Sequence, residues 1–210
     1  MKVVAINGSP KNKGNTNRAL EIVGAELRKQ QIDFVILHIG NRVIRGCTAC
    51  GLCKKNQDNK CSMNDDLNLI IPQLMEADGL ILGSPVYYSG IAGTMKSFLD
   101  RLFYVSSANG NFFRHKVGAA ICAVRRSGGL PTFQSLNNYF TYSEMFIPTS
   151  NYWNVIHGTV PGDVEQDGEG VQIARVLGKN MAWLLKVVEL GKKEVPAPVA
   201  EKKEVTCFVR

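Results

Sequence analysis

Short β-branched runs that alternate with amphipathic stretches most restrict what this chain can fold into. The apolar runs cover residues 3–6, 34–39, 79–83, 116–124 and, with the weakest pattern, 145–153. Helical spacing of apolar residues fits residues 16–30, 66–77, 94–103, 131–140 and 171–190. Alternating strands and helices form right-handed βαβ units. The sequence therefore predicts an α/β fold, with a doubly wound five-stranded parallel sheet covered by helices on both faces.

Length and composition predict a single domain. The chain has 210 residues, of which 45% are hydrophobic and 20% charged, as in an ordinary globular protein. We expect one domain over residues 1–190, containing a cysteine-rich loop at 47–61, and an extended tail at 191–210. No apolar run approaches the ~20 residues that cross a bilayer, and the first residues form a strand instead of a secretory leader. We therefore expect a cytoplasmic protein with no membrane partner.

The formal charge of +7 is unevenly distributed. Residues 42–61 carry five basic residues against Asp58 alone. Residues 101–143 carry no acid and five basic residues, namely Arg101, Arg114, Lys116, Arg125 and Arg126. A solvated basic surface explains most such runs, and the alternative is a field that attracts phosphates or a negatively charged cluster. No DNA- or RNA-binding motif accompanies the charge, so we expect no nucleic-acid partner.

The first loop after a strand is rich in groups that bind anions. Residues 7–17 read Asn-Gly-Ser-Pro-Lys-Asn-Lys-Gly-Asn-Thr-Asn and lead into a helix, whose N-terminal amides favour an anion. Further donors for a phosphate come from Ser9, Asn15, Thr16 and Asn17. The loop matches neither the Walker A pattern nor the dinucleotide glycine pattern. An ordinary turn capped by Asn15 or Thr16 is the alternative.

Two later loops follow the third and fourth strands. Residues 84–93 read Ser-Pro-Val-Tyr-Tyr-Ser-Gly-Ile-Ala-Gly, and residues 125–129 read Arg-Arg-Ser-Gly-Gly. The two tyrosines offer flat faces for stacking, although such pairs more often serve packing. In a sheet of strand order 2-1-3-4-5, the loops after the first, third and fourth strands are neighbours at the carboxyl edge, where ligands bind. Their convergence predicts a ligand site.

These three loops resemble those of the NADPH-dependent FMN reductases, and most closely the iron–sulfur flavoprotein branch, over residues 1–190. The resemblance implies a flavodoxin-like fold, FMN as cofactor, and homodimers or homotetramers with the flavin near a subunit boundary. It implies that the FMN phosphate is bound by Ser9, Lys11, Asn15, Thr16 and Asn17. It places the ring and ribityl chain along Pro85, Val86, Tyr87, Tyr88 and Ser89. It places the far edge of the ring against Arg126, Ser127, Gly128 and Gly129.

Four of the six cysteines lie in one loop, at Cys47, Cys50, Cys53 and Cys61. Two C-x-x-C steps that share a central cysteine bring three thiolates onto one small cluster, which favours a [4Fe–4S] cluster held by the four thiols. A structural zinc site usually has two separate C-x-x-C pairs and fits less well, and free thiols are the other alternative. Basic residues that would offset the charge of a cluster are Arg42, Arg45, Lys54, Lys55 and Lys60. The loop resembles the cysteine motif of the iron–sulfur flavoproteins, but its gap before Cys61 is longer than in bacterial ferredoxins.

Other residues with reactive side chains have simpler interpretations. Cys122 lies inside a predicted strand and is expected to be a buried small hydrophobe. Cys207, in the tail, is expected to be inert. His157 either supports a turn or faces the flavin of a neighbouring subunit, and the first interpretation is favoured. Asp65 and Asp66 are expected at a helix N-cap and not as a catalytic pair.

FMN carries the chemistry in either of two function classes. It accepts a hydride or single electrons, so we expect no catalytic side chain. One class is an enzyme that oxidises NAD(P)H and reduces a small acceptor such as a quinone. The other is a non-enzymatic carrier with FMN and a cluster, which receives electrons from ferredoxin. The tyrosine loop and basic turn favour the enzyme, and the cysteine loop favours the carrier.

Overall fold

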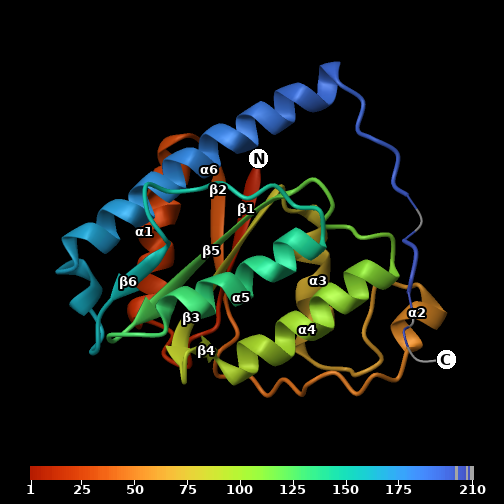
Figure 1. Ribbon diagram of the computed structural model, residues 1–210, viewed down its shortest axis with the longest axis horizontal. Coiled ribbons are helices and arrows are strands. Elements are labelled where there is room, and N and C mark those ends of the chain that lie inside the picture. The colour runs from red at the N-terminus through yellow and green to blue at the C-terminus, as the bar shows by residue number, and fades with distance from the viewer. Residues whose placement is uncertain (202, 207, 209–210) are drawn as a thin grey trace.

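The computed structural model describes residues 1–201, 203–206 and 208. Its strands are β1 (Lys2–Asn7), β2 (Asp33–His38), β3 (Gly79–Tyr87), β4 (Gly90–Ile91), β5 (Val117–Val124) and β6 (Val155–His157). Its α-helices are α1 (Asn15–Lys29), α2 (Leu52–Asn56), α3 (Asp66–Glu76), α4 (Gly93–Ala108), α5 (Gly129–Tyr142) and α6 (Gly168–Glu194), and η1 (Asp163–Glu165) is a 3₁₀ turn. Figure 1 shows the helices packed on both sides of the sheet.

The sheet has the order β2-β1-β3-β5-β6, and these five strands pair in parallel. Counted along the chain, this is the predicted order 2-1-3-4-5. The short strand β4 pairs antiparallel with the end of β3, so that residues 86–91 form a hairpin. The carboxyl ends of β1, β3 and β5 are therefore adjacent, and the loops that follow them share one edge.

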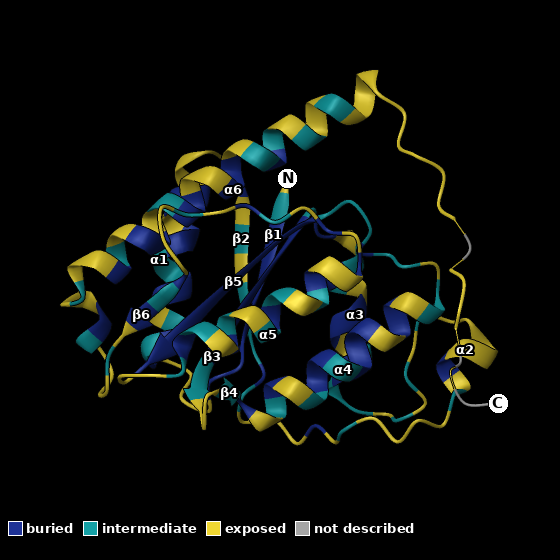
Figure 2. Ribbon diagram, in the orientation of Figure 1, coloured by how far each residue is buried: buried dark blue, intermediate teal, exposed yellow. Residues whose placement is uncertain are grey.

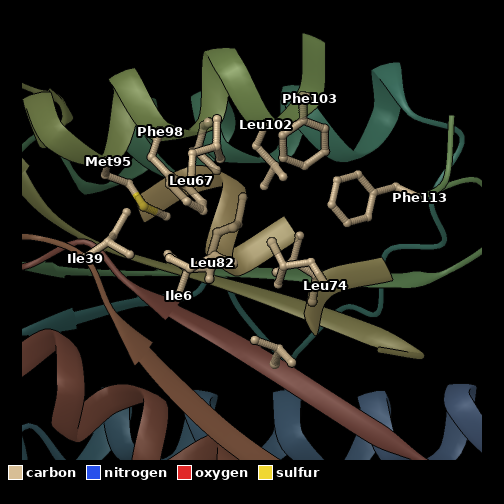
Figure 3. Close-up of a cluster of buried hydrophobic side chains, with 14 of the residues drawn as sticks. Ile6, Ile39, Leu67, Leu74, Leu82, Met95, Phe98, Leu102, Phe103 and Phe113 are labelled. Carbon is tan, nitrogen blue, oxygen red and sulfur yellow. The ribbon is translucent and has the colours of Figure 1, made fainter. Parts of the chain in front are cut away.

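Alternate residues of each strand face opposite helical layers. On β1, Val4 and Ile6 join the apolar cluster that includes α3, α4 and α5, whereas Val3 and Ala5 join the cluster that includes α1 and α6. The central strands are buried on both faces (Figure 2), as their nearly continuous apolar sequence predicts. Figure 3 shows Phe98 of α4 among the side chains that cover the first of these faces.

The predicted strand at residues 145–153 is wrong. Only Phe146 of this segment makes a ladder contact, an isolated bridge to Val117, and Pro148 has no amide proton to donate to a ladder. The fifth parallel strand is instead β6, which pairs with residues 122–124 of β5. Just before it, the Asn154 side chain donates to the carbonyl of Ala120 at 3.0 Å, which fixes where β6 begins.

Two basic residues of the run at 101–143 are not part of a solvated surface. Arg101 is 1% exposed. Lys116 is partly buried, and its ammonium donates to the carbonyls of Leu74 (3.1 Å) and Met75 (2.5 Å) at the C-terminus of α3. Burial lowers the pKa of Lys116. Both side chains bind groups inside the protein. Fewer than the five basic residues of this run are therefore available to a ligand at the surface.

The end of the chain runs across the surface. Helix α6 continues to Glu194, beyond the expected end at residue 190. In the tail, the carbonyl of Pro198 accepts from Arg114 at 3.0 Å, and the Lys203 ammonium lies 4.3 Å from the centre of the Tyr142 ring. Cys207 lies outside the described residues. Among the helices of the described residues, none is both long and apolar enough to cross a bilayer.

Candidate functional site

The loop at residues 7–17, here called the phosphate loop, opens the first helix without a capping side chain. The N-cap of α1 is Gly14, which rules out the alternative of a turn capped by Asn15 or Thr16. Glycine has no side chain to occupy the first amides of the helix, and the first turn of α1 carries no acid. These amides remain available to an anion, and the helix dipole favours one there.

A buried asparagine organises the phosphate loop from below. Asn7 is 0% exposed. Its Oδ1 accepts from the amide of Ser9 at 3.0 Å, and its Nδ2 donates to Asn12 O and to Asn17 Oδ1, each at 3.3 Å. The Ser9 hydroxyl in turn accepts from the amide of Lys11 at 3.2 Å. The loop is thus held in one conformation by its own hydrogen bonds.

A pocket of about 230 Å³ lies over the N-terminus of α1. It brings together seven of the residues expected to bind FMN, namely Ser9, Lys11, Asn15, Thr16, Pro85, Val86 and Tyr87. Lys11 and Arg125 line it as cations. The lining combines amides, hydroxyls and two basic side chains with the apolar Pro85–Tyr87 segment, a combination that suits a phosphate joined to a polyol chain and a ring. The residues present therefore fit FMN.

Among the residues expected from the first two loops, three are not part of the lining of this pocket, namely Asn17, Tyr88 and Ser89. Asn17 Oδ1 is engaged by Asn7. Tyr88 and Ser89 form the turn of the β3–β4 hairpin, and both have a positive φ (49° and 58°). Tyr88 is fully exposed. The hairpin therefore presents an aromatic ring to solvent at the rim of the site.

The basic turn after β5 borders a second pocket. Arg126, Ser127, Gly128 and Gly129 line a space of about 250 Å³ together with residues of β6 and the start of α6. The turn still touches the hairpin, because a β-carbon on Gly128 (φ 87°) would lie 2.6 Å from Ser89 Oγ. His157, which also lines this space, ends β6, and its Nδ1 lies 3.3 Å from Asp167 Oδ2. The two neighbouring arginines of this turn therefore line different pockets, Arg125 the FMN pocket and Arg126 the second pocket.

Sequence reasoning missed the segment after β6. Gly158, Thr159 and Pro161 line the FMN pocket, and the amide of Gly162 donates to Asn15 Oδ1 at 2.9 Å. The rule that ligands meet the loops after parallel strands would have found this segment had the last strand been placed correctly. Asn7 was also missed, because nothing in the sequence indicates that its side chain turns back into the loop.

The cysteine loop, residues 47–61, brings its four thiols to one small pocket of about 10 Å³. Cys47, Cys50, Cys53 and Cys61 all line it, with Arg101 at its inner wall. Ala49 and Gly51 have a positive φ (53° and 69°) and turn the backbone sharply on either side of Cys50. Figure 1 shows this segment running from β2 to α2, a short helix without apolar periodicity that the sequence did not predict.

The four thiols differ in their surroundings. Cys47 and Cys50 are exposed, Cys61 is partly buried and Cys53 is buried. The Ser62 hydroxyl, 3.2 Å from Cys50 Sγ, lowers the pKa of Cys50, whereas burial raises the pKa of Cys53. Since the thiolate is the form that binds metal, Cys50 is the easier of these two to convert into a ligand.

Three side chains outside the cysteine loop fix it to the domain. Asn68 accepts from the amide of Cys61 at 2.8 Å and donates to its carbonyl at 2.9 Å. Asn109 accepts from the amide of Asn59 at 3.0 Å and donates to the carbonyl of Cys53 at 3.4 Å. Arg101 donates to the Cys61 sulfur at 3.3 Å. These contacts join residues 7 to 56 positions apart, so no local pattern predicts them.

Four cysteines are the usual donor set of an iron–sulfur cluster, but in this structure they do not surround a space large enough for a cluster. Within the described part of the chain, no three Cys, His, Asp or Glu side chains are grouped closely enough to hold one metal ion. In a cluster each thiolate binds a different iron, so the thiols stand farther apart than around one zinc. The present pocket is smaller than a cube. The exposed Cys47–Cys50 side of the loop would have to move outward to admit one.

The fold and the phosphate loop define a flavodoxin-like α/β protein. Residues 1–160 match the family model of the NADPH-dependent FMN reductases, and the chain belongs to that family. It is therefore an FMN-dependent oxidoreductase.

Similar proteins support this placement. An iron–sulfur flavoprotein of Methanocaldococcus jannaschii is 33% identical over 196 residues, which is 90% of this chain and 100% of the relative. An NAD(P)H:quinone oxidoreductase from Methanothermobacter marburgensis has a TM-score of 0.64 at 17% identity, over 86% of this chain and 96% of that one. A flavodoxin from the Archaea has a TM-score of 0.57 at 17% identity, over 89% and 99% of the two chains. The two solved structures share the fold.

Proposed function

We propose that this protein uses FMN to transfer electrons from NAD(P)H to a small acceptor such as a quinone. The observation that carries the proposal is the pocket over α1, where uncapped helix amides, Lys11 and Arg125 meet the Pro85–Tyr87 segment. FMN, when bound, accepts a hydride or single electrons. The role of the chain is to bind FMN, to hold the ring at the rim of the pocket, and to leave one face open to a donor.

Each part of the site has an assigned role in this proposal. The phosphate is bound by side chains or backbone amides of Ser9, Lys11, Asn15, Thr16 and Asn17. The ring and ribityl chain lie along Pro85, Val86, Tyr87, Tyr88 and Ser89. The far edge of the ring is bordered by Arg126, Ser127, Gly128 and Gly129, whose turn touches Ser89.

Cofactor and donor are tested separately. Mass spectrometry of material released by denaturing the purified protein should identify FMN and no FAD. Stopped-flow absorbance should then show reduction of the bound flavin by NADH or NADPH, at a rate that saturates with the nucleotide. A protein that neither retains nor takes up FMN contradicts the whole proposal. If the protein binds FMN but its flavin is reduced only by ferredoxin, NAD(P)H is not the donor. That result contradicts the enzyme proposal and supports the electron-carrier function proposed below.

The cysteine loop favours a second function, that of an electron carrier. We propose that Cys47, Cys50, Cys53 and Cys61 hold a [4Fe–4S] cluster, which when bound supplies one-electron transfer. The four cysteines that line one pocket support this. Exposed basic residues within the loop and just before it also support it, and they would attract an acidic ferredoxin; they are Arg42, Arg45, Lys54, Lys55 and Lys60. Anaerobic reconstitution with iron and sulfide should give about four irons per chain, one for each thiolate ligand of a cube. A protein that stays free of iron under these conditions is an FMN reductase without a cluster.

We further propose that the protein is a homodimer or homotetramer. Exposed aromatic side chains lie beside both pockets, with Tyr87 and Tyr88 on the β3–β4 hairpin and Tyr152 and Trp153 at the second pocket, and exposed apolar side chains of this kind are typical of interaction sites. Sedimentation equilibrium of the FMN-bound protein should give a mass of two or four chains. A single-chain mass at all concentrations contradicts this proposal and leaves the flavin site unaffected.

A further inference from the structure

Arg101 is a charged residue that is buried beside the four cysteines. It projects from α4, its side chain is 0% exposed, and it lines the cysteine pocket. Burying a guanidinium is costly unless its charge is paired and its donors are satisfied. Arg101 meets both conditions, and it meets them entirely through residues 45–65.

All five N–H donors of the guanidinium have an acceptor. The two terminal nitrogens donate to the Asp65 carboxylate, Nη1 to Oδ2 at 2.5 Å and Nη2 to Oδ1 at 3.0 Å. Nη1 also donates to the carbonyl of Arg45 at 3.2 Å, and Nη2 to that of Met63 at 3.5 Å. The fifth donor, Nε, points at the Cys61 sulfur at 3.3 Å. A bidentate carboxylate fixes the plane of a guanidinium, so Asp65 sets the direction in which Nε donates.

A guanidinium has five N–H donors and is not deprotonated in proteins, so the Arg101 side chain is a permanent donor. The backbone of Cys61 is fixed independently by Asn68. Cys61 is therefore held at both its main chain and its sulfur, in contrast to the exposed Cys47 and Cys50.

We propose that Arg101 is the positioning residue for the Cys61 ligand and raises the reduction potential of the cluster. This inference rests on the cluster proposed above. A hydrogen bond to a ligand sulfur stabilises the more negatively charged, reduced state, and such bonds are among the factors that set cluster potentials. Because Asp65 cancels the charge of Arg101, the effect comes from the directed N–H group and not from an added positive charge.

The matched test compares Arg101→Lys with Arg45→Lys. Lysine keeps a positive charge for Asp65 but cannot grip a carboxylate in two places and also direct a separate donor at Cys61. Arg45 is exposed, lies two residues before Cys47 and meets Arg101 through its carbonyl, so Arg45→Lys keeps both that contact and the local positive charge. Both variants and the unchanged protein are reconstituted anaerobically, and the cluster potential is measured by redox titration followed by electron paramagnetic resonance. Iron release to a chelator and FMN affinity are measured on the same samples.

We expect a more negative cluster potential and iron retention weakened by about tenfold in Arg101→Lys, the scale typical of groups that orient metal ligands. FMN affinity should be unchanged, and Arg45→Lys should match the unchanged protein throughout. An Arg101→Lys protein that binds FMN but loads no iron also supports the positioning role. An unchanged potential together with unchanged iron retention overturns the inference.

A second variant covers the case in which Arg101→Lys does not fold, as judged by circular dichroism and lost FMN binding. Asp65→Asn with Arg101→Gln removes both charges of the pair together, so that the site of the buried Arg101 holds no unpaired charge. It is read by the same measurements, with the same expected and contradicting results. If the unchanged protein takes up no iron, the cluster proposal itself is wrong. If it takes up iron but the potential and iron retention do not change with residue 101, only the role of Arg101 is wrong.

Discussion

The Nε2 atom of His38 lies 2.7 Å from the carbonyl oxygen of Ser9, so the last residue of β2 donates to the phosphate loop. Two residues later, Gly40 approaches the same carbonyl so closely that a β-carbon there would lie 2.0 Å from Ser9 O. The end of β2 is thus packed against the backbone of the FMN pocket without lining it. This contact gives a way to disturb the pocket from outside.

Gly40→Ala should weaken FMN binding. The added methyl group meets backbone atoms, which cannot swing aside, and overpacking of this kind costs typically about 1–3 kcal/mol. Displacement of Ser9 should raise the FMN dissociation constant by about tenfold, which is about 1.4 kcal/mol. Flavin fluorescence titration measures it. Gly191→Ala is the matched control, because a β-carbon there meets no atom within 4 Å beyond the neighbouring backbone of its own helix. Equal affinities in the two variants would show that the Gly40–Ser9 contact does not shape the pocket.

Thr16→Glu should weaken FMN binding more strongly. Thr16 is 2% exposed and lines the pocket at the first turn of α1. A carboxylate there repels a phosphate and takes up the helix amides itself. Loss of one hydrogen bond to a charged group is worth about 1.5–3 kcal/mol, so the dissociation constant should rise by more than about tenfold. Thr141→Glu adds the same charge at the exposed end of α5 and should bind FMN normally. Normal binding by Thr16→Glu would move the phosphate site elsewhere.

Cys50→Ala should remove iron from anaerobically reconstituted protein and leave FMN in place. Cys50 lines the cysteine pocket, and the FMN pocket is built from other loops. Iron and flavin are measured per chain in the same sample. Cys122→Ala is the control, since Cys122 is buried in β5 and belongs to neither pocket. Iron retained at full level in Cys50→Ala would remove Cys50 from the ligand set.

Most of the fold was predictable because its signals are local. The apolar runs at β1, β3 and β5 are largely buried on parallel strands, and the run at β2 lies partly exposed at the edge of the sheet. Along the chain, the helices α1, α3 and α4, each with an apolar face, lie between these strands. The strand β6 was not predictable, because it is only three residues long. Its start is fixed by the side chain of Asn154, which forms a hydrogen bond to β5. The apolar composition of residues 145–153 looked more like a strand, but only Phe146 reaches β5.

The candidate sites were predictable only in part, for the same reason. The phosphate loop and the cysteine loop can be recognised from residues that are close together in the sequence. Arg101 appeared only as one cation in a basic run, because its meaning depends on contacts with residues 36 to 56 positions away. Thr159 and Pro161 escaped notice because they follow a strand that was placed too early.

The acid stability of the protein should depend on Asp167, the N-cap of α6. Its carboxylate accepts from the amides of Gly170 (2.9 Å) and His157 (2.7 Å). Burial opposes ionisation of Asp167, but these bonds outweigh it and lower its pKa below the ordinary value. A group with a lowered folded-state pKa stabilises the fold above its unfolded pKa of about 3.9, and the contribution is lost as the pH falls through the folded value.

Asp167→Ala should therefore lower the free energy of unfolding by about 1 kcal/mol at pH 7, the usual value of an N-cap. The difference from the unchanged protein should shrink as the pH falls below about 4. Urea unfolding followed by circular dichroism at a series of pH values measures this. Glu169→Ala, in the exposed first turn of the same helix, should show a smaller difference. A gap that stays constant from pH 7 to pH 3 would mean that the cap acts without its charge.

The contact between Cys61 and Arg101 also sets an order of events during synthesis. The two residues are 40 positions apart, and a ribosome that adds 5–20 residues per second needs about 2–8 s to cover that distance. All four cysteines are thus translated before the side chain that holds the last of them exists in the chain. For those seconds the nascent segment carries its full set of thiols without its anchor. The mature arrangement can form only after α4 has been made and packed.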